Sequence, residues 1–276
     1  MTRRKTMKPK HFVFPYVGWL AFFVVAPIIL IVIFAFTTSD GSVTLDNFSS
    51  MGRYASVFLR SFWLSFISTV ICIIIGYPIA YILSRESRRV QRVMIMLIML
   101  PMWMSFLLRT YAWMSILENT GLLNQFLGSV GLPTVSVINT QTAVVIGMVY
   151  NFLPFMILPI YSVIVKIDRS LVEAAQDLGA GTTAVFRKLI FPLSLPGVLS
   201  GVTMVFVPGV STFVISQLLG GGKEMLLGDL IDLQFLGTAY DPHLGSSIAL
   251  VMMVIVIIFM YIMNRFGEGE EQAVGL

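Results

Sequence analysis

Six long runs of apolar residues, separated by short polar segments, dominate the pattern of this chain. A helix needs about 20 consecutive apolar residues to cross the core of a bilayer, and each run is long enough to do so. The runs lie near 13–36, 62–83, 93–117, 142–165, 197–219 and 245–263. The pattern therefore predicts an all-α polytopic membrane protein with six transmembrane helices.

The composition supports this fold class. Of the 276 residues, 57% are hydrophobic and 12% are charged, whereas soluble proteins carry about 25% charged residues. No segment outside the apolar runs is long enough to fold as a separate domain. We therefore expect residues 1–276 to form a single transmembrane domain.

The basic residues are sorted by loop. They gather in the N-terminal tail, after the second run and after the fourth run: Arg3, Arg4, Lys5, Lys8 and Lys10; Arg85, Arg88, Arg89 and Arg92; and Lys166, Arg169, Arg187 and Lys188. The positive-inside rule places such loops in the cytoplasm, so both termini are predicted to be cytoplasmic. Because the cations follow topology and form no patch laced with aromatic residues, no nucleic-acid partner is expected.

The polar segment 168–192, between the fourth and fifth runs, carries the signals of a helix-turn-helix. Ser170 is followed three residues later by Glu173, which predicts a capping box at the start of the first helix. Gly179 predicts the end of that helix, because glycine readily adopts the left-handed conformation found there. The spacing alone is equally compatible with a capped amphipathic loop that lies on the membrane surface.

A second short helix is expected to follow this turn. Thr182 or Thr183 is in position to cap it. Pro192 is expected to prevent its direct continuation into the fifth apolar run, because proline removes a helix hydrogen bond and clashes with the preceding turn.

The order Glu173-Ala174-Ala175, then Gly179 and then Pro192 resembles the EAA motif of ABC importer permeases. The resemblance implies the MetI-like fold of type I importers and a coupling helix that docks on a cytoplasmic ATPase. It also implies roles for individual residues: Glu173 as a polar contact, the two alanines as a small surface that allows close approach, and Gly179 as a pivot. The coupling residues so implied are Glu173, Ala174, Ala175, Asp177, Gly179 and Pro192.

Further segments resemble the permeases of spermidine/putrescine importers, namely residues 108–113, 121–124, 149–155, 219–223 and 227–229. Related permeases for opines or phosphonates share much of this pattern and stay as an alternative. The resemblance implies a PotA-like ATPase dimer, a PotC-like second permease, a PotD-like extracytoplasmic substrate-binding protein, a polyamine substrate and the bilayer of a bacterial cytoplasmic (inner) membrane.

The chain itself is predicted to bind no cofactor and to be no enzyme. The glycines before Lys223 lack the spacing of a phosphate-binding loop, and Glu224 follows where such a loop needs serine or threonine. ATP and Mg²⁺ are therefore expected on the partner ATPase. Catalytic and metal-ligating residues are predicted to be absent, since the two histidines, His11 and His243, lie outside the runs and Cys72 is the only cysteine.

A polyamine carries several ammonium groups, so its path should offer carboxylates, carbonyls and aromatic faces. Asp229 and Asp232 are three residues apart and would share one face of a helix; with Glu118 and Asp241 they are candidates for an acidic entrance. The substrate-pathway candidates are Asp229, Asp232, Glu118, Tyr150, Asn151 and Trp103. The alternatives are solvated loops, a docking surface for the binding protein and, for the aromatic residues, interfacial anchors.

Arg109 is a cation inside the third run. A charge there is costly, and a cation would repel a polyamine, so we expect a structural role in a buried ion pair or a contact with helix carbonyls. An ion-coupled secondary transporter is a further alternative for the whole chain. It would need acidic residues within the membrane, and none of the runs has one well inside it.

Overall fold

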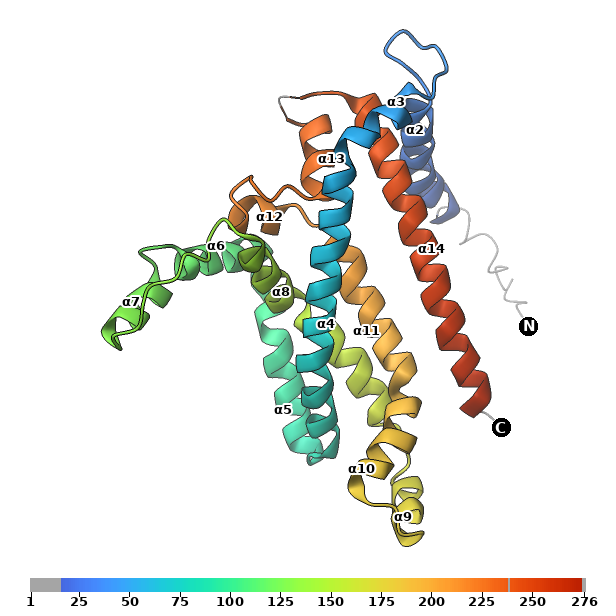
Figure 1. Ribbon diagram of the computed structural model, residues 1–276. Coiled ribbons are helices and arrows are strands. Elements are labelled where there is room, and N and C mark those ends of the chain that lie inside the picture. The colour runs from blue at the N-terminus through green and yellow to red at the C-terminus, as the bar shows by residue number, and fades with distance from the viewer. Residues whose placement is uncertain (1–15, 238, 275–276) are drawn as a thin grey trace, which may run out of the picture. The chain divides into compact units, whose positions relative to one another are not determined.

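The computed structural model describes residues 16–237 and 239–274, apart from the side chains of Arg169 and residues 267–274. The basic N-terminal tail, His11 and the start of the first apolar run lie outside these residues. The described chain is almost entirely helical (Figure 1), with one isolated antiparallel bridge between Thr37 and Val43.

The first apolar run forms a helix over Tyr16–Ala35, in which a π-helical turn, η1 (Ala21–Val25), leads into α2 (Ala26–Ala35). The following elements are α3 (Asp46–Ser50), η2 (Met51–Tyr54), α4 (Ala55–Arg85), α5 (Arg88–Met99), η3 (Leu100–Trp103), α6 (Phe106–Leu117), α7 (Leu122–Ser129) and α8 (Gln141–Ile164). The remaining elements are α9 (Arg169–Asp177), α10 (Thr182–Val185), η4 (Phe186–Ile190), α11 (Phe191–Ser211), α12 (Val214–Leu219), α13 (Leu227–Phe235) and α14 (Pro242–Val274).

The prediction of six apolar helices is close to what the described residues contain. Five helices are long and apolar enough to cross a membrane: Tyr16–Ala35, Asp46–Arg85, Gln141–Ile164, Thr182–Ser211 and Pro242–Phe266. A sixth candidate is a bent pair, Arg88–Trp103 with Phe106–Ser129, whose two limbs meet at 89°. The count reaches six if this pair is one span.

Two runs differ from the straight helices that hydropathy predicts. The third run, 93–117, is broken at η3, where Pro101 interrupts the helical hydrogen bonds and Ser105 begins a new helix. The fifth run, 197–219, does not continue to Leu219, because α11 ends at Ser211 and a separate short helix, α12, follows. Hydropathy averages over a run and does not register such breaks in the backbone.

By contacts within the described residues, the chain forms two compact units. The smaller unit comprises the chain up to Tyr54 together with Ile231–Val254, and the larger comprises Ala55–Leu230 and the chain from Ile255. In the smaller unit, polar side chains bind carbonyl groups at the end of α2. Asn47 Nδ2 donates to the Ala35 and Thr37 oxygens, both at 3.0 Å, and Ser247 Oγ donates to the Ala35 oxygen at 3.2 Å.

In the larger unit α4, α8 and α11 pack against one another as a three-helix bundle. Glycines let the helices approach closely, as is common in membrane proteins. A Cβ added to Gly76 of α4 would lie 3.1 Å from Met156 Cγ of α8, and one added to Gly201 of α11 would lie 2.7 Å from Met156 Sδ. Met156 is fully buried between them.

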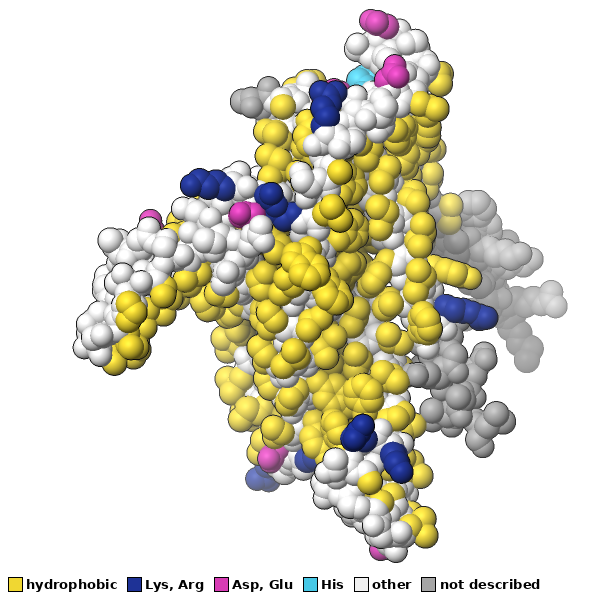
Figure 2. Space-filling view, viewed as in Figure 1, with side chains coloured by type: hydrophobic (Ala, Val, Ile, Leu, Met, Phe, Trp, Pro, Cys, Tyr) yellow, Lys and Arg dark blue, Asp and Glu magenta, His cyan; other side chains and the backbone are white. Residues whose placement is uncertain are grey.

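The outer surface of the larger unit is mainly hydrophobic. Trp63, Ile74 and Ile82 on α4 are all more than half exposed, and Figure 2 shows yellow side chains along the length of this helix, with Lys and Arg side chains toward its ends. Exposed apolar helix faces of this extent indicate contact with lipid or with another membrane subunit.

Gly197 offers a test of the bundle. We expect Gly197→Ala to lower thermal stability, because its new Cβ would lie 2.9 Å from the Pro159 oxygen and 3.1 Å from Ile160 Cα, both backbone atoms. Overpacking of this kind costs about 1–3 kcal/mol. The measurement is the melting temperature of the purified protein. Gly128→Ala in α7 is the matched control, since its Cβ would meet nothing within 4 Å; equal melting temperatures for the two variants would contradict the packing argument.

Candidate functional site

The segment between α8 and α11 is a helix-turn-helix, as the sequence predicts, but its first cap is a different residue. Asp168, with extended backbone angles, is the N-cap of α9, and its Oδ1 accepts a hydrogen bond from the Ser170 amide at 3.0 Å. The predicted capping box is therefore wrong, because Ser170 is already the second residue of the helix and Leu171, not Glu173, occupies the third position that a capping box uses.

The cap depends on the charge of Asp168. Hydrogen bonds from the backbone and then the side chain of Ser170 lower the pKa of the Asp168 carboxyl group. A lowered pKa means that the folded state favours the ionised form, so this contribution is present above the usual pKa of aspartate and is lost as the pH falls through the lowered value. The side chain is fully exposed, so the interaction is screened by solvent.

The end of α9 confirms the prediction for Gly179. Its φ is +83°, in the left-handed region. The Gly179 amide donates to the Gln176 oxygen at 2.8 Å, and the Ala180 amide donates to the Ala175 oxygen at 3.0 Å. These two bonds form a Schellman motif. A Cβ at Gly179 would meet nothing within 4 Å, so it is the backbone conformation, and not crowding, that requires glycine here.

The second helix begins differently from the prediction. Gly181, and neither Thr182 nor Thr183, is the N-cap of α10, and no side chain caps it. Pro192 does not separate this helix from the fifth apolar run, because one continuous helix extends over Thr182–Ser211.

A π-helical turn explains how the helix passes Pro192. Immediately before the proline, η4 replaces the α-helical pattern, and the Phe191 amide bonds to the Phe186 oxygen five residues earlier. The wider turn relieves the contact between the proline ring and the preceding carbonyl groups that would break an α-helix.

One face of α9 is exposed and the other packs on the bundle. Val172 and Ala175 contact the buried core, together with Phe186 and Leu189 of η4. The predicted coupling residues Glu173, Ala174, Asp177 and Gly179 are exposed, whereas Ala175 is half-buried and Pro192 is exposed at the start of α11. Of the two alanines, Ala174 alone is fully on the surface.

Leu178 is a surface feature that the sequence analysis did not select. It lies at the C-cap of α9 and is 90% exposed, beside Ala174, Asp177 and Gly179 on the chain. In sequence it resembles an ordinary core residue of an amphipathic helix. Its exposure places an apolar side chain on the open face of α9.

Aromatic rings join the loop to α4. The Phe186 ring of η4 meets the Tyr77 and Tyr81 rings edge-on, with centroids 5.8 and 5.3 Å apart. Tyr77 is buried, and its hydroxyl shares a 2.7 Å hydrogen bond with Ser194 Oγ of α11. The loop is therefore in direct contact with α4 and, through Tyr77, with α11.

The structure places the acidic substrate-pathway candidates in different surroundings. Asp229 and Asp232 both lie on the short helix α13, so the three-residue spacing does place them on one helix. Asp229 is buried, and its Oδ2 accepts the Leu226 amide at 2.7 Å, which caps the helix. Asp232 is half-buried and Glu118 is exposed at the end of α6.

The uncharged candidates lie on α8 and η3. Asn151 is 2% exposed and its Nδ2 donates to the Gly147 oxygen at 2.9 Å. Tyr150 is half-buried against the Trp113 ring, at 5.3 Å between centroids. Trp103 is 76% exposed. The role of all these residues in substrate passage stays a prediction.

Arg109 is buried in α6 at 8% exposure. Its guanidinium carbon lies 5.9 Å from the Phe106 ring centroid, and its Nε has no hydrogen-bond partner among the described residues. Among the described residues, an ion pair joins Arg60 Nη1 and Glu224 Oε2 at 3.2 Å. The buried ion pair expected for Arg109 is thus not found there.

Comparison with known proteins connects this architecture to a family. A model described as "Binding-protein-dependent transport system inner membrane component" matches residues 49–267. The protein named spermidine/putrescine transport system permease protein PotB of Haemophilus influenzae is 39% identical over 270 residues, covering 92% of this chain and 94% of that protein. The protein of the same name from Escherichia coli is 36% identical and covers 89% of this chain and 93% of its own length. The Escherichia coli inner membrane ABC transporter permease protein YdcU is 26% identical and covers 83% of this chain and 77% of its own length.

Solved structures share the fold. A chain of a bacterial ABC transporter involved in the import of the acidic polysaccharide alginate superposes with a TM-score of 0.80 at 16% identity, covering 94% of each chain. A chain of the MetNI methionine ABC transporter gives a TM-score of 0.57, also at 16% identity, and covers 78% of this chain and 95% of that one.

Gly179 and Gly181 form a matched pair for testing the turn after α9. We expect Gly179→Ala to destabilise the end of α9, because a left-handed residue with a Cβ costs about 1–2 kcal/mol. The measurement is amide hydrogen exchange over residues 169–180, which should speed up. Gly181→Ala should leave exchange unchanged, since Gly181 has a φ of −66° and open space at its Cβ position. Similar exchange in both variants would contradict the role of backbone conformation.

Proposed function

The chain belongs to the family of inner-membrane components of binding-protein-dependent transport systems, and from this premise we propose that it is the permease subunit of an ATP-driven polyamine importer. It forms half of the path for spermidine or putrescine through a bacterial cytoplasmic membrane. The observation that carries the substrate is the 36–39% identity, over about nine-tenths of the chain, to proteins named as spermidine/putrescine permeases.

The helix-turn-helix 168–192 supports the coupling mechanism. Its exposed ridge, formed by Glu173, Ala174, Asp177 and Leu178, docks on a cytoplasmic ATPase, while the opposite side of α9 stays packed on the bundle. Ala174 permits close approach, and Gly179 holds the turn that ends the ridge. The ATPase binds ATP and Mg²⁺ and hydrolyses ATP, and the permease makes and breaks no covalent bond.

The proposal includes an orientation and a set of partners. Both termini and the loop 168–192 face the cytoplasm, in agreement with the sorting of basic residues. The partners are a PotA-like ATPase dimer, a PotC-like second permease that completes the path and a PotD-like binding protein that delivers the polyamine from outside. The exposed apolar faces of the bundle are available for the second permease and for lipid.

The substrate assignment is tested in the purified complex. The chain and its co-purifying partners are reconstituted in vesicles, and ATP hydrolysis is measured with the binding protein and one solute at a time. Spermidine or putrescine is expected to raise the rate, because closure of the ATPase is coupled to delivery of the substrate. Activation by an opine or a phosphonate alone would contradict the polyamine assignment and keep the importer. Transport by the chain without an ATPase would contradict the importer.

Leu178 tests the docking surface. We expect Leu178→Ser to reduce solute-stimulated ATP hydrolysis by about tenfold, because an apolar anchor at the centre of an interface contributes about 1–2 kcal/mol or more. Leu132→Ser is the control, since Leu132 is also an exposed leucine, at 52%, but lies in the segment between α7 and α8. The measurement is made on equal amounts of inserted protein. An unchanged rate in Leu178→Ser would place the ATPase contact elsewhere.

A further inference from the structure

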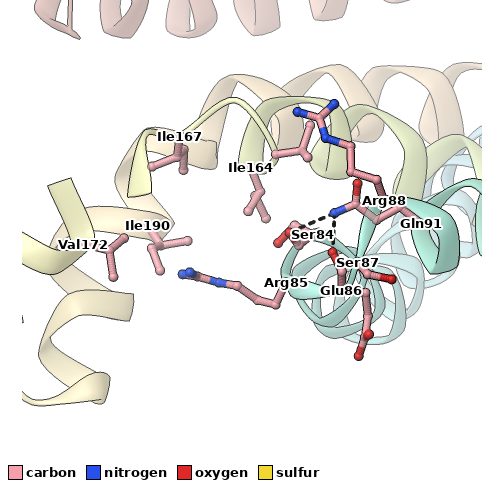
Figure 3. Close-up of a pocket in the computed structure, with 11 residues that line it drawn as sticks. Ser84, Arg85, Glu86, Ser87, Arg88, Gln91, Ile164, Ile167, Val172 and Ile190 are labelled. Carbon is pink, nitrogen blue, oxygen red and sulfur yellow. Dashed lines mark hydrogen bonds between the residues drawn. The ribbon is translucent and has the colours of Figure 1, made fainter. Parts of the chain in front are cut away.

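A cavity of about 410 Å³ lies in the larger unit beside the proposed coupling loop, residues 168–192. Its lining has two parts, which Figure 3 shows on opposite sides. One part is the turn between α4 and α5, and the other is the junction of α8, α9 and η4. The lining residues are Ser84, Arg85, Glu86, Ser87, Arg88 and Gln91, and Ile164, Val165, Ile167, Val172 and Ile190.

Gln91 fixes the polar side of this cavity. It is 8% exposed, and its Nε2 donates to the Ser84 oxygen at 3.2 Å and to the Glu86 oxygen at 2.9 Å. The Tyr161 hydroxyl of α8 donates to Gln91 Oε1 at 3.1 Å. These hydrogen bonds hold the turn between α4 and α5 against α8. They also fix the backbone positions of the residues in that turn.

The charge on this side is predominantly positive. Arg85 extends toward Val172 and Ile190, Arg88 extends past Ile164, and the Glu86 carboxylate is directed away from the apolar wall (Figure 3). The Arg85 guanidinium carbon lies 5.2 Å from the Tyr81 ring centroid, which supports its extended position. Neither arginine forms an ion pair with a described residue. Ser87, the N-cap of α5, makes no side-chain cap bond, so the positive end of the helix dipole also faces this region.

We propose that this cavity binds the phosphate group of an anionic phospholipid. Arg85 and Arg88 supply the positive charge that attracts the phosphate, because guanidinium groups pair strongly with phosphate oxygens. The apolar wall, which includes Ile164, Ile167 and Ile190, receives the glycerol and the first acyl carbons.

The position of the cavity favours a lipid over a soluble anion. It lies where the long apolar helices α4 and α8 end, which is the level of phospholipid headgroups, and about half of its lining residues are isoleucine or valine. Basic pockets between membrane helices commonly hold anionic headgroups. Because Val172 of α9 and Ile190 of η4 also line it, the bound lipid touches both helices of the coupling loop.

The experiment measures lipid binding directly, so its outcome is independent of the substrate and of ATP hydrolysis. The purified importer complex in detergent is titrated with phosphatidylglycerol, and bound lipid is followed by native mass spectrometry. Removing a cation that pairs with an anionic headgroup is worth roughly fivefold per residue. The double variant Arg85→Gln, Arg88→Gln is therefore expected to bind phosphatidylglycerol about 25-fold more weakly than the unchanged protein.

A matched pair of arginines supplies the control. Arg89 and Arg92 lie on the same helix, are exposed and do not line the cavity, so Arg89→Gln, Arg92→Gln should weaken binding by only about twofold through long-range attraction. Equal losses in the two double variants would overturn the site, as would equal affinity for phosphatidylcholine. Displacement of the lipid by inorganic phosphate at moderate concentration would overturn the lipid assignment in favour of a soluble anion.

Discussion

The close approach of α4, α8 and α11 is the constraint on which the rest of the larger unit depends. Gly76 and Gly201 provide the space, and Met156 fills it from the middle helix. At this separation the Tyr77 hydroxyl of α4 forms a hydrogen bond with Ser194 of α11. Tyr77 also contacts Phe186 of the π-helical turn in the segment 168–192, so the position of this segment depends on the packing of the bundle.

The features that the sequence predicts correctly are those with a local physical cause. The apolar run 142–165 corresponds to α8, Gln141–Ile164, almost residue for residue, because the membrane imposes a length on any helix that crosses it. Gly179 is predicted because a left-handed residue in a Schellman turn strongly favours glycine, whatever surrounds it. The sequence predicts the N-cap of α9 two residues too late. Asp168 and Ser170 are both residue types that cap helices well, and the choice between them depends on where the chain leaves α8.

Features that depend on distant contacts could not be predicted. Pro101 explains why the third run is broken, but the 89° angle between its limbs depends on the packing of other helices. The exposure of Leu178 likewise depends on how α9 lies on the bundle. The Arg60–Glu224 pair joins residues far apart in sequence, and Gln141 Nε2 adds a 3.1 Å hydrogen bond to the same carboxylate. The helix continues through Pro192 because of the π-helical turn η4. No single residue in the sequence predicts such a turn.

The distribution of acids bears on how a polyamine could pass. The helices α4, α8 and α11 contain no Asp or Glu between their ends, and the bundle carries no carboxylate that would bind an ammonium group tightly. Aromatic faces and carbonyl groups, worth about 0.5–2 kcal/mol for each cation, give weaker holding sites. Weak binding of the polyamine within the bundle is compatible with an importer of the proposed kind, because substrate that binds too tightly inside the membrane would not be released. In the proposed importer, selection of the cation would therefore fall to the external binding protein, and the permease would supply a path that opens through the coupling loop.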